Sequence, residues 1–322
     1  MAVYTKLSES EIKDFFSKYN LGKLLNYRGI KEGIENTNYF TEAEKGKFIL
    51  TIYEKRVEEK DLPFFISLMK NIYDKNFPSP EPIINKNGSY ISEILKKKAA
   101  VISFIDGNAK KNLSPDECYQ VGTYAAKLHQ ITKKLNIKRE NKLSVNSWRE
   151  IYNKVRKNCT KIDKNLPEII EKNLNDIEKN WPKNIPSGII HADLFPDNIF
   201  FKKNKLSGII DYYFACHDFY AFEIAICLNA LCFEGSKENL SFNVTKATKF
   251  INGYSSIRKL TDEEKNSLII LCKGAAIRFL LTRVFDYLNL IEGAIVTVKD
   301  PVEYLKRLEF HNSIKSYQDY FF

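Results

Sequence analysis

Apolar and polar positions alternate over short distances in the first hundred residues and recur at helical spacing afterwards. Short apolar segments bounded by glycines or charged turns are typical of strands. Five segments fit that pattern: 24–30, 38–41, 47–53, 90–95 and 99–104. A helix is predicted over 58–75, where apolar side chains share one face, and prolines from Pro78 onward end it. An earlier helix is predicted to begin at Ser8, which forms a capping box with Glu11.

The pattern changes after Gly107. Ser114 is a helix cap and Pro115 suits the first helical position, so a helix is predicted to begin there. Helical periodicity continues in five segments: 147–157, 166–180, 218–232, 243–254 and 262–290. One island of strand-like sequence, 188–211, interrupts these helices.

These patterns together predict an α+β protein with two lobes. The N-terminal lobe, 1–105, is expected to be small and to hold a sheet with its helix. The C-terminal lobe, 106–322, is expected to be large and mainly helical, with the hinge near 103–107. Hydrophobic residues make up 44% of the 322 residues and aromatic residues 13%, which is enough apolar material for packed cores and excludes a disordered chain.

Composition narrows the expected location and partners. No apolar run approaches the length of a membrane span, and the N-terminal MAVYTKLSES lacks the apolar region of a signal peptide. We therefore expect a cytoplasmic protein without a membrane partner. The net charge is +10, but only 9 of the 50 basic residues are Arg and the lysines are scattered. Nucleic-acid-binding faces concentrate basic residues and favour Arg, so we expect no nucleic-acid partner.

The strand-like island carries the strongest chemical signal. His191, Asp193 and Asn198 form a His-x-Asp motif with an asparagine five residues after the aspartate, and Asp211 follows two isoleucines. A turn over 202–205 would join two strands as a hairpin and bring Asn198 and Asp211 to one end of it. Phosphoryl transfer needs a carboxylate that accepts the proton of the attacking hydroxyl, and oxygen ligands for Mg²⁺. Asp193 supplies the first and Asn198 and Asp211 the others, in the chain order of protein kinases.

An isolated motif of this kind also occurs in ordinary loops, where Asp193 and Asn198 would only cap turns. The apolar flanks, the later Asp211 and the two-lobe pattern favour the kinase interpretation. His191 is grouped with the catalytic residues as an organiser of the loop through hydrogen bonds. Neither the P-loop pattern GxxxxGK nor the Rossmann pattern GxGxxG occurs, which disfavours other nucleotide-binding folds.

Residues 188–211 resemble the catalytic core of the aminoglycoside phosphotransferase/choline kinase superfamily, which has a protein-kinase-like bilobal fold. Three further stretches, 33–40, 211–233 and 278–283, resemble bacterial homoserine kinases of that superfamily, and together they span both lobes. The resemblance implies an ATP- and Mg²⁺-dependent kinase that phosphorylates the hydroxyl of L-homoserine, a step toward threonine. A related kinase for an amino alcohol, an aminoglycoside or a methylthio-sugar is the first alternative.

The same resemblance implies further roles for individual residues. The turn after the first strand would cover the nucleotide through Gly33, Asn36, Thr37 and Asn38. The hinge would offer backbone groups to the adenine through Ser103, Phe104 and Ile105. The candidate acceptor-site residues are Tyr39, His217, Asp218, Glu223, Arg278 and Arg283.

Both arginines lie in an otherwise apolar helical segment, where an unpaired guanidinium is costly. One of them is expected to hold the substrate carboxylate, although an internal salt bridge, such as Arg283 with Asp286, explains the pattern equally well. Asp218 and Glu223 would either meet the substrate ammonium or brace the catalytic loop, and bracing is favoured for Glu223.

One departure from the kinase pattern keeps a second alternative open. The third strand carries Thr51 where kinases present a lysine to the phosphates, and no glutamate on the following helix is well placed as its partner. A nucleotide-binding pseudokinase that acts as an interaction module would tolerate this change. The intact Asp193, Asn198 and Asp211 argue for catalysis instead.

Overall fold

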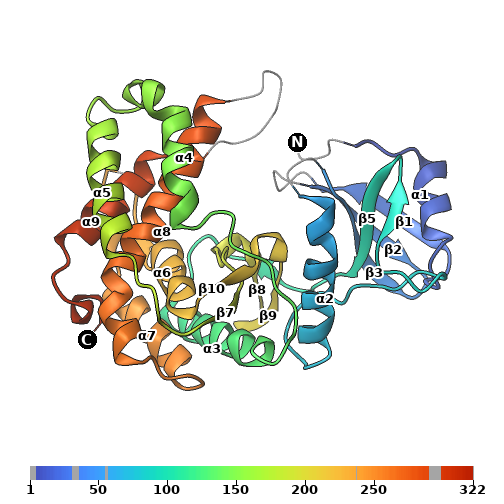
Figure 1. Cartoon of the computed structure of the whole chain (residues 1–322). Coiled ribbons are helices and arrows are strands. Elements are labelled where there is room, and N and C mark those ends of the chain that lie inside the picture. Colours follow the sequence, from blue (N-terminus) through green and yellow to red (C-terminus); the bar gives the residue numbers. More distant parts are fainter. Residues whose placement is uncertain (1–4, 31–35, 55–56, 237, 290–298, 322) are drawn as a thin grey trace. The chain divides into compact units, whose positions relative to one another are not determined.

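The computed structural model describes residues 5–30, 36–54, 57–236, 238–289 and 299–321. The chain forms two compact units and passes between them more than once. The first includes Met1–Gly107 and Ser207–Tyr213; the second includes Asn108–Leu206, Phe214–Glu292 and Thr297–Phe322. The first is rich in strands and the second in helices (Figure 1), which confirms the α+β prediction.

An antiparallel sheet in the order β1-β2-β3-β5-β4 forms the first unit. Its strands are β1 (Leu24–Gly29), β2 (Thr37–Ala43), β3 (Gly46–Ile52), β4 (Ser92–Ile94) and β5 (Lys97–Ser103). Two helices, α1 (Glu9–Phe16) and α2 (Leu62–Tyr73), flank the sheet (Figure 1). Leu50 and Ile52 share one face of β3, because side chains alternate along a strand, and belong to the core beneath α1.

Local sequence explains where the first helices begin. The Ser8 side chain accepts a hydrogen bond from the backbone of Glu11, and the Glu11 side chain accepts one from Ser8, so the predicted capping box is confirmed. α2 begins at Leu62, later than predicted. Pro63 occupies its first turn, where the missing N–H does no harm, and Glu59–Asp61 form a 3₁₀ turn before it.

The long helix α8 (Asp262–Leu288) organises the second unit, where it packs against α4, α5, α6 and α9. The other helices are α3 (Pro115–Thr132), α4 (Val145–Val155), α5 (Leu166–Asn180), α6 (Tyr220–Leu231), α7 (Val244–Ser255) and α9 (Val302–Ser313). α3 packs against α7. The bounds of α4 to α8 lie within a few residues of the predicted segments and α3 begins where predicted, whereas α9 was not predicted.

The remaining strands are short. They are β6 (Asn108–Ala109), β7 (Ser187–Ile190), β8 (Ile199–Lys202), β9 (Lys205–Ile209), β10 (Cys216–Phe219), β11 (Phe233–Glu234) and β12 (Ser241–Phe242). β7 pairs with β10, and β6, β8 and β9 form a sheet in that order. Lys203 and Asn204 have positive φ of 50° and 60°, as a two-residue hairpin turn requires. This confirms the turn predicted over 202–205.

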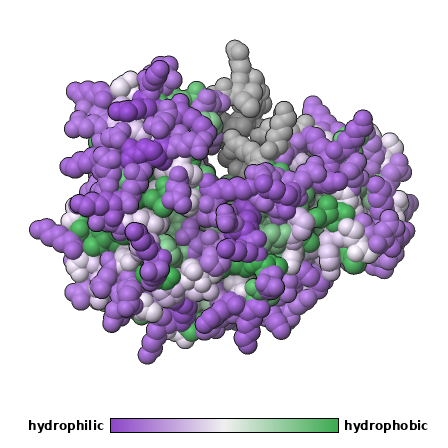
Figure 2. Space-filling model, in the orientation of Figure 1, coloured by the Kyte–Doolittle hydropathy of each residue, from purple (hydrophilic) through white to green (hydrophobic). Residues whose placement is uncertain are grey.

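The surface is mainly polar. The face shown in Figure 2 is largely hydrophilic, with apolar residues in small scattered groups. All six cysteines are buried and unbridged. Within the described ranges, no helix has the length and apolar character that a membrane span requires.

The crossing of α3 and α7 leaves no room for side chains at two glycines. A Cβ atom on Gly122 would lie 2.0 Å from the backbone oxygen of Phe250, and one on Gly253 would lie 2.0 Å from that of Tyr119. Real Cβ atoms do not approach oxygen so closely, so the two helices can touch only because both residues are glycine.

Gly122→Ala is therefore expected to lower the free energy of unfolding by about 3 kcal/mol, since the helices must separate. Thermal melting should show a midpoint lower by roughly 6–12 °C. Gly88→Ala is the control: a Cβ there meets nothing within 4 Å, and only its φ of +80° opposes alanine, at a cost of about 1 kcal/mol. Equal losses in the two variants would contradict the packing explanation.

Candidate active site

The loop after β7 holds two catalytic candidates in one tight turn. Asp193 is half-buried, and Asn198 ends a 3₁₀ turn over Pro196–Asn198. The amide nitrogen of Asn198 donates to the backbone oxygen of Asp193 at 2.8 Å and to its carboxylate Oδ2 at 3.1 Å. Both contacts use the nitrogen, so the amide oxygen of Asn198 remains available as a ligand. The structure thus brings Asp193 and Asn198 together.

The environment of Asp193 suits a proton acceptor. Burial raises the pKa of the Asp193 carboxyl to about 6, because desolvation penalises the charged form. The positive charge of Arg278 opposes this shift, and the carboxylate of Asp197 adds to it. A carboxylate with such a pKa is ionised at neutral pH and more basic than an ordinary aspartate, which favours proton uptake.

A buried glutamate on α6 holds the backbone of the same loop. The carboxylate of Glu223 accepts hydrogen bonds from the backbone N–H of His191 and, at 3.1 and 3.2 Å, from that of Ala192. Burial raises the pKa of Glu223 to about 7, although the two N–H groups oppose the shift. Ala192 has a φ of 64°, which is uncommon for a residue with a side chain. The contacts of Glu223 support a bracing role.

Arg278 reaches the loop from α8. Its side chain is only 2% exposed, and its Nη1 donates to the backbone oxygen of Ala192 at 2.7 Å. Its Nε is buried without a hydrogen-bond partner. Arg283 differs, because its Nη1 donates to the Glu303 carboxylate at 2.8 Å and to the backbone oxygen of Asp300 at 2.9 Å. Arg283 therefore has an internal salt bridge, whereas Arg278 supports the catalytic loop.

The histidines and Asp218 lie along β7 and β10. His191 is buried, and its Nδ1 accepts a hydrogen bond from the backbone N–H of Asp193 at 3.3 Å, as expected of a loop organiser. The backbone N–H of His217 donates to the backbone oxygen of Arg139 at 2.6 Å. Asp218 is half-buried, and burial raises the pKa of its carboxyl. Substrate contacts of His217 and Asp218 stay predictions.

Asp211 belongs to the first unit, where it follows β9. Its φ of 64° bends the chain sharply. Two residues later, the ring of Tyr213 packs edge-on against Phe65 of α2, with 5.5 Å between centroids, and its hydroxyl lies 3.3 Å from that of Tyr53. These contacts fix the chain just after Asp211 within the first unit. Its role as a metal ligand stays a prediction.

The expected nucleotide-covering segment is described from Asn36 onward, and Gly33 lies outside the described residues. Thr51, at the position expected for a lysine, is buried, and its hydroxyl donates to Oδ1 of Asn38 at 2.8 Å. The Oδ1 atom of Asn36 accepts a hydrogen bond from the backbone of Glu54 at 3.3 Å. At the position where kinases have a lysine, Thr51 therefore makes a hydrogen bond between neutral groups.

A lysine–glutamate pair that the sequence did not reveal lies at the strand ends. Lys97 of β5 contacts one oxygen of the Glu54 carboxylate, Oε2, at 2.5 Å. The hydroxyls of Thr37 and Thr5 donate to the other oxygen of Glu54, Oε1, at 2.8 and 2.7 Å. Lys97 shares a face of β5 with Val101, which belongs to the core beneath α1. Only strand pairing brings these residues together, so no sequence signal could have found the pair.

The hinge residues are mostly engaged within the sheet. The backbone N–H groups of Ser103 and Phe104 donate to backbone oxygens at 2.8 and 3.0 Å. A Cβ atom on Gly208 of β9 would lie 2.3 Å from the side chain of Ile105, which shows how closely that strand approaches. Adenine recognition by this segment stays a prediction.

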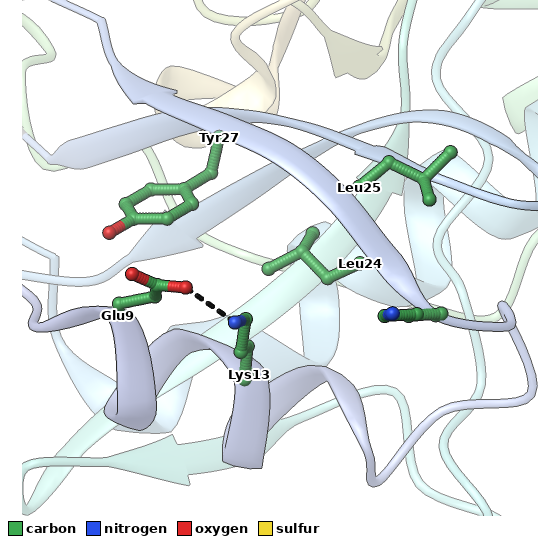
Figure 3. A pocket seen from close by; sticks show the side chains of 6 residues that line it. Glu9, Lys13, Leu24, Leu25 and Tyr27 are labelled. Carbon is green, nitrogen blue, oxygen red and sulfur yellow. Dashed lines mark hydrogen bonds and ion pairs between the residues drawn. The ribbon is translucent and has the colours of Figure 1, made fainter.

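In the described part of the chain, the surroundings of Tyr39 and a hollow at α1 and β1 contain no other candidate acceptor-site residues. Tyr39 is buried, and its hydroxyl bonds to the backbone of Thr5 at 2.9 Å and of Leu7 at 3.0 Å. An open hollow of ≈ 260 Å³ lies at α1 and β1, and an ion pair between Glu9 and Lys13 forms part of its wall (Figure 3). Its lining residues are Glu9, Lys13, Lys23, Leu24, Leu25 and Tyr27. None of these is a predicted site residue.

Comparison with known proteins identifies a family and several relatives. Residues 26–258 match the model of the "Phosphotransferase enzyme family". A protein of Mesorhizobium japonicum named homoserine kinase is 43% identical over 320 residues, which cover 99% of this chain and 99% of that relative. One of Bradyrhizobium diazoefficiens with the same name is 45% identical over 321 residues, covering 99% and 97%.

Solved structures share the fold at low sequence identity. An amicoumacin kinase, solved in complex with AMP-PNP and Ca²⁺, has a TM-score of 0.70 at 13% identity, covering 97% of this chain and 95% of that one. A spectinomycin phosphotransferase has a TM-score of 0.67 at 12% identity, covering 98% of each. These similarities confirm the expected kinase-like fold. With the family match over most of its length, the chain belongs to the phosphotransferase enzyme family.

Proposed function

We propose that the chain transfers the γ-phosphoryl group of ATP to the hydroxyl of L-homoserine, giving ADP and O-phospho-L-homoserine. The observation that carries this proposal is the near-full-length similarity, at 43% and 45% identity, to two proteins named homoserine kinase. The turn that holds Asp193 and Asn198 supports it, because a proton acceptor and an amide oxygen lie side by side there.

In this proposal Asp193 orients the acceptor hydroxyl and takes its proton as the hydroxyl oxygen attacks the γ-phosphorus. Its pKa of about 6 leaves it ionised at neutral pH. Glu223 and Arg278 hold the backbone on both sides of Ala192 and so fix the position of the neighbouring Asp193. Such positioning matters because a misplacement of about 1 Å can cost roughly 100-fold in rate.

Asn198 and Asp211 would hold Mg²⁺ on the phosphates of ATP. Amide and carboxylate oxygens are ligands that this hard cation prefers, and the hairpin β8–β9 links the two residues along the chain. Within the described ranges no three His, Cys, Asp or Glu side chains form a metal cluster. That suits Mg²⁺, which binds through one or two carboxylates together with phosphates. When bound, Mg²⁺ neutralises charge on the transferred group.

The proposal includes the location and the partners expected from the sequence. We propose that the protein acts in the cytoplasm and that small molecules, ATP and the amino acid, are its ligands. The scarcity of arginine, 9 of 50 basic residues, supports the expectation that nucleic acid is not a partner. Thr51 remains the one feature that a pseudokinase would share, and release of ADP in the presence of an acceptor separates the two possibilities.

Substrate choice is the first test. L-homoserine should be phosphorylated in preference to choline, kanamycin and L-serine. The serine hydroxyl is one methylene closer to the charged groups, so it would stop short of the transfer position. ADP release measured across this panel, with Mg²⁺ and ATP held constant, checks the order. Equal or faster turnover of choline would overturn the assignment of homoserine.

Substitutions should separate the base from the metal ligands. Asp193→Asn keeps the shape but removes the proton acceptor, so kcat should fall by about 10²–10⁴-fold with little change in KM for ATP. Asp211→Asn and Asn198→Ala should instead raise the Mg²⁺ concentration needed for half-maximal rate. Thermal melts establish that each variant is folded. The assignments are exchanged if Asp193→Asn shifts the Mg²⁺ dependence and Asp211→Asn does not.

The dependence of rate on pH should report Asp193. Because its pKa is raised to about 6 and the base must be ionised, kcat/KM for homoserine should be level above pH 7 and fall below pH 6. The decline should approach tenfold per pH unit. The residual activity of Asp193→Asn should lack this decline. If the variant keeps it, another group, such as Glu223 with its pKa of about 7, controls the acid limb.

A further inference from the structure

Arg278 and Asp218 are two charged side chains of the second unit that form no ion pair among the residues that the structure describes. Arg278 makes one hydrogen bond, to the backbone oxygen of Ala192, and its buried Nε makes none. Asp218 accepts hydrogen bonds only from neutral groups. These are the side-chain amide of Asn141, at 2.6 Å to Oδ2, and the backbone N–H of Phe219, at 2.7 Å to Oδ1.

The two charges influence each other without touching. Burial raises the pKa of Asp218, and the positive charge of Arg278 is among the influences that lower it. Yet no contact of 4.0 Å or less joins the guanidinium of Arg278 to the carboxylate of Asp218. A buried charge without a partner is costly, and folding usually brings such groups together or exposes them. Here both remain separate and at least half-buried.

Arg278 and Asp218 both contact or neighbour the segment that leads to Asp193, the proposed base. Arg278 holds the backbone of Ala192, the residue before Asp193. β10, which carries Asp218, pairs with β7, which leads into the loop, and Asp218 lies opposite Gly188. The Cζ atom of Arg278 lies 5.8 Å from the ring of Phe214, two residues before β10 begins. Arg278 therefore contacts the loop that carries Asp193, and Asp218 lies on the strand that pairs with the start of β7.

We propose that Arg278 and Asp218 recognise the two charges of an α-amino-acid acceptor: the α-carboxylate at Arg278 and the α-ammonium at Asp218. A zwitterion supplies both missing partners at once, and its side-chain hydroxyl is then directed toward Asp193. The guanidinium fork matches a carboxylate, and the amide of Asn141 holds the Asp218 carboxylate in place for the ammonium. This inference rests on the proposed function and specifies how its acceptor is selected.

The inference selects between two arginines that the sequence left equivalent, and it assigns the ammonium to Asp218 while Glu223 keeps the bracing role that the sequence favoured. Arg283 is excluded as the carboxylate ligand because Glu303 already neutralises it. Glu223 is excluded as the ammonium ligand because its carboxylate accepts the backbone N–H groups of His191 and Ala192. Asn141 enters the site as a positioning residue that the sequence did not suggest.

Truncated acceptors test the two contacts separately. 3-Aminopropan-1-ol is homoserine without its carboxylate, and 4-hydroxybutanoate is homoserine without its ammonium. Asp218→Asn should lower kcat/KM about 10- to 100-fold for L-homoserine and 3-aminopropan-1-ol but not for 4-hydroxybutanoate. Arg278→Met should lower it for L-homoserine and 4-hydroxybutanoate more than for 3-aminopropan-1-ol. If a truncated compound turns over too slowly, its inhibition constant against L-homoserine replaces kcat/KM.

Matched controls come from an ion pair elsewhere on the same helix. Lys273 of α8 contacts Asp176 at 3.1 Å, so Lys273→Met and Asp176→Asn remove one charge each from the same unit. Both controls should leave the preference among the three acceptors unchanged. KM for ATP should also stay constant in Asp218→Asn.

The outcomes separate this inference from the proposed function. If the wild-type protein does not phosphorylate L-homoserine, the proposed function fails. If it does, and Asp218→Asn lowers kcat/KM equally for all three compounds, Asp218 only supports the fold and the inference is overturned. The test does not depend on Arg278→Met being folded. The Asp218→Asn comparison decides the ammonium contact by itself, and Arg278→Lys, which keeps the charge without the fork, tests the carboxylate contact.

Discussion

The buried carboxylate of Glu223 is the interaction on which the candidate site depends. It accepts hydrogen bonds from two consecutive backbone N–H groups, those of His191 and Ala192. Ala192, which directly precedes Asp193, has a positive φ. Without this acceptor, two buried donors would lose their partner at about 1–3 kcal/mol each. Asp193 and Asn198 owe their positions to this support, because the turn that joins them starts from the braced backbone.

Buried charged side chains in the second unit differ in whether another side chain neutralises them. Arg258, which lies between α7 and α8, contacts the fully buried Glu264 at 2.8 Å, and Arg283 of α8 contacts Glu303 of α9 at 2.8 Å, so these pairs neutralise themselves. Arg278 instead contacts only backbone oxygen and aromatic rings. Charges that the fold itself does not neutralise are typical of sites that a ligand completes, because the ligand then supplies the compensating charge.

The first unit shows how a kinase-like sheet is built without the usual strand lysine. Thr51 is buried and donates a hydrogen bond to Asn38 on the neighbouring strand, so this position stabilises the sheet. A different lysine–glutamate pair, Lys97 with Glu54, joins β5 to the residues after β3, and both side chains contact Thr5. The Lys97–Glu54 pair therefore serves the structure of the unit, at the strand ends.

The sequence by itself determined the two-part architecture, the bounds of most helices and the residues of the candidate catalytic turn, because these depend on neighbours within a few residues. Periodicity located α8, and the spacing from Asp193 to Asn198 fixed one loop. Only the tertiary structure decided which charges are paired. Arg278 meets a residue 86 positions away and Glu223 one 32 positions away. Such partners follow from how helices pack and strands align, and no local pattern records that packing.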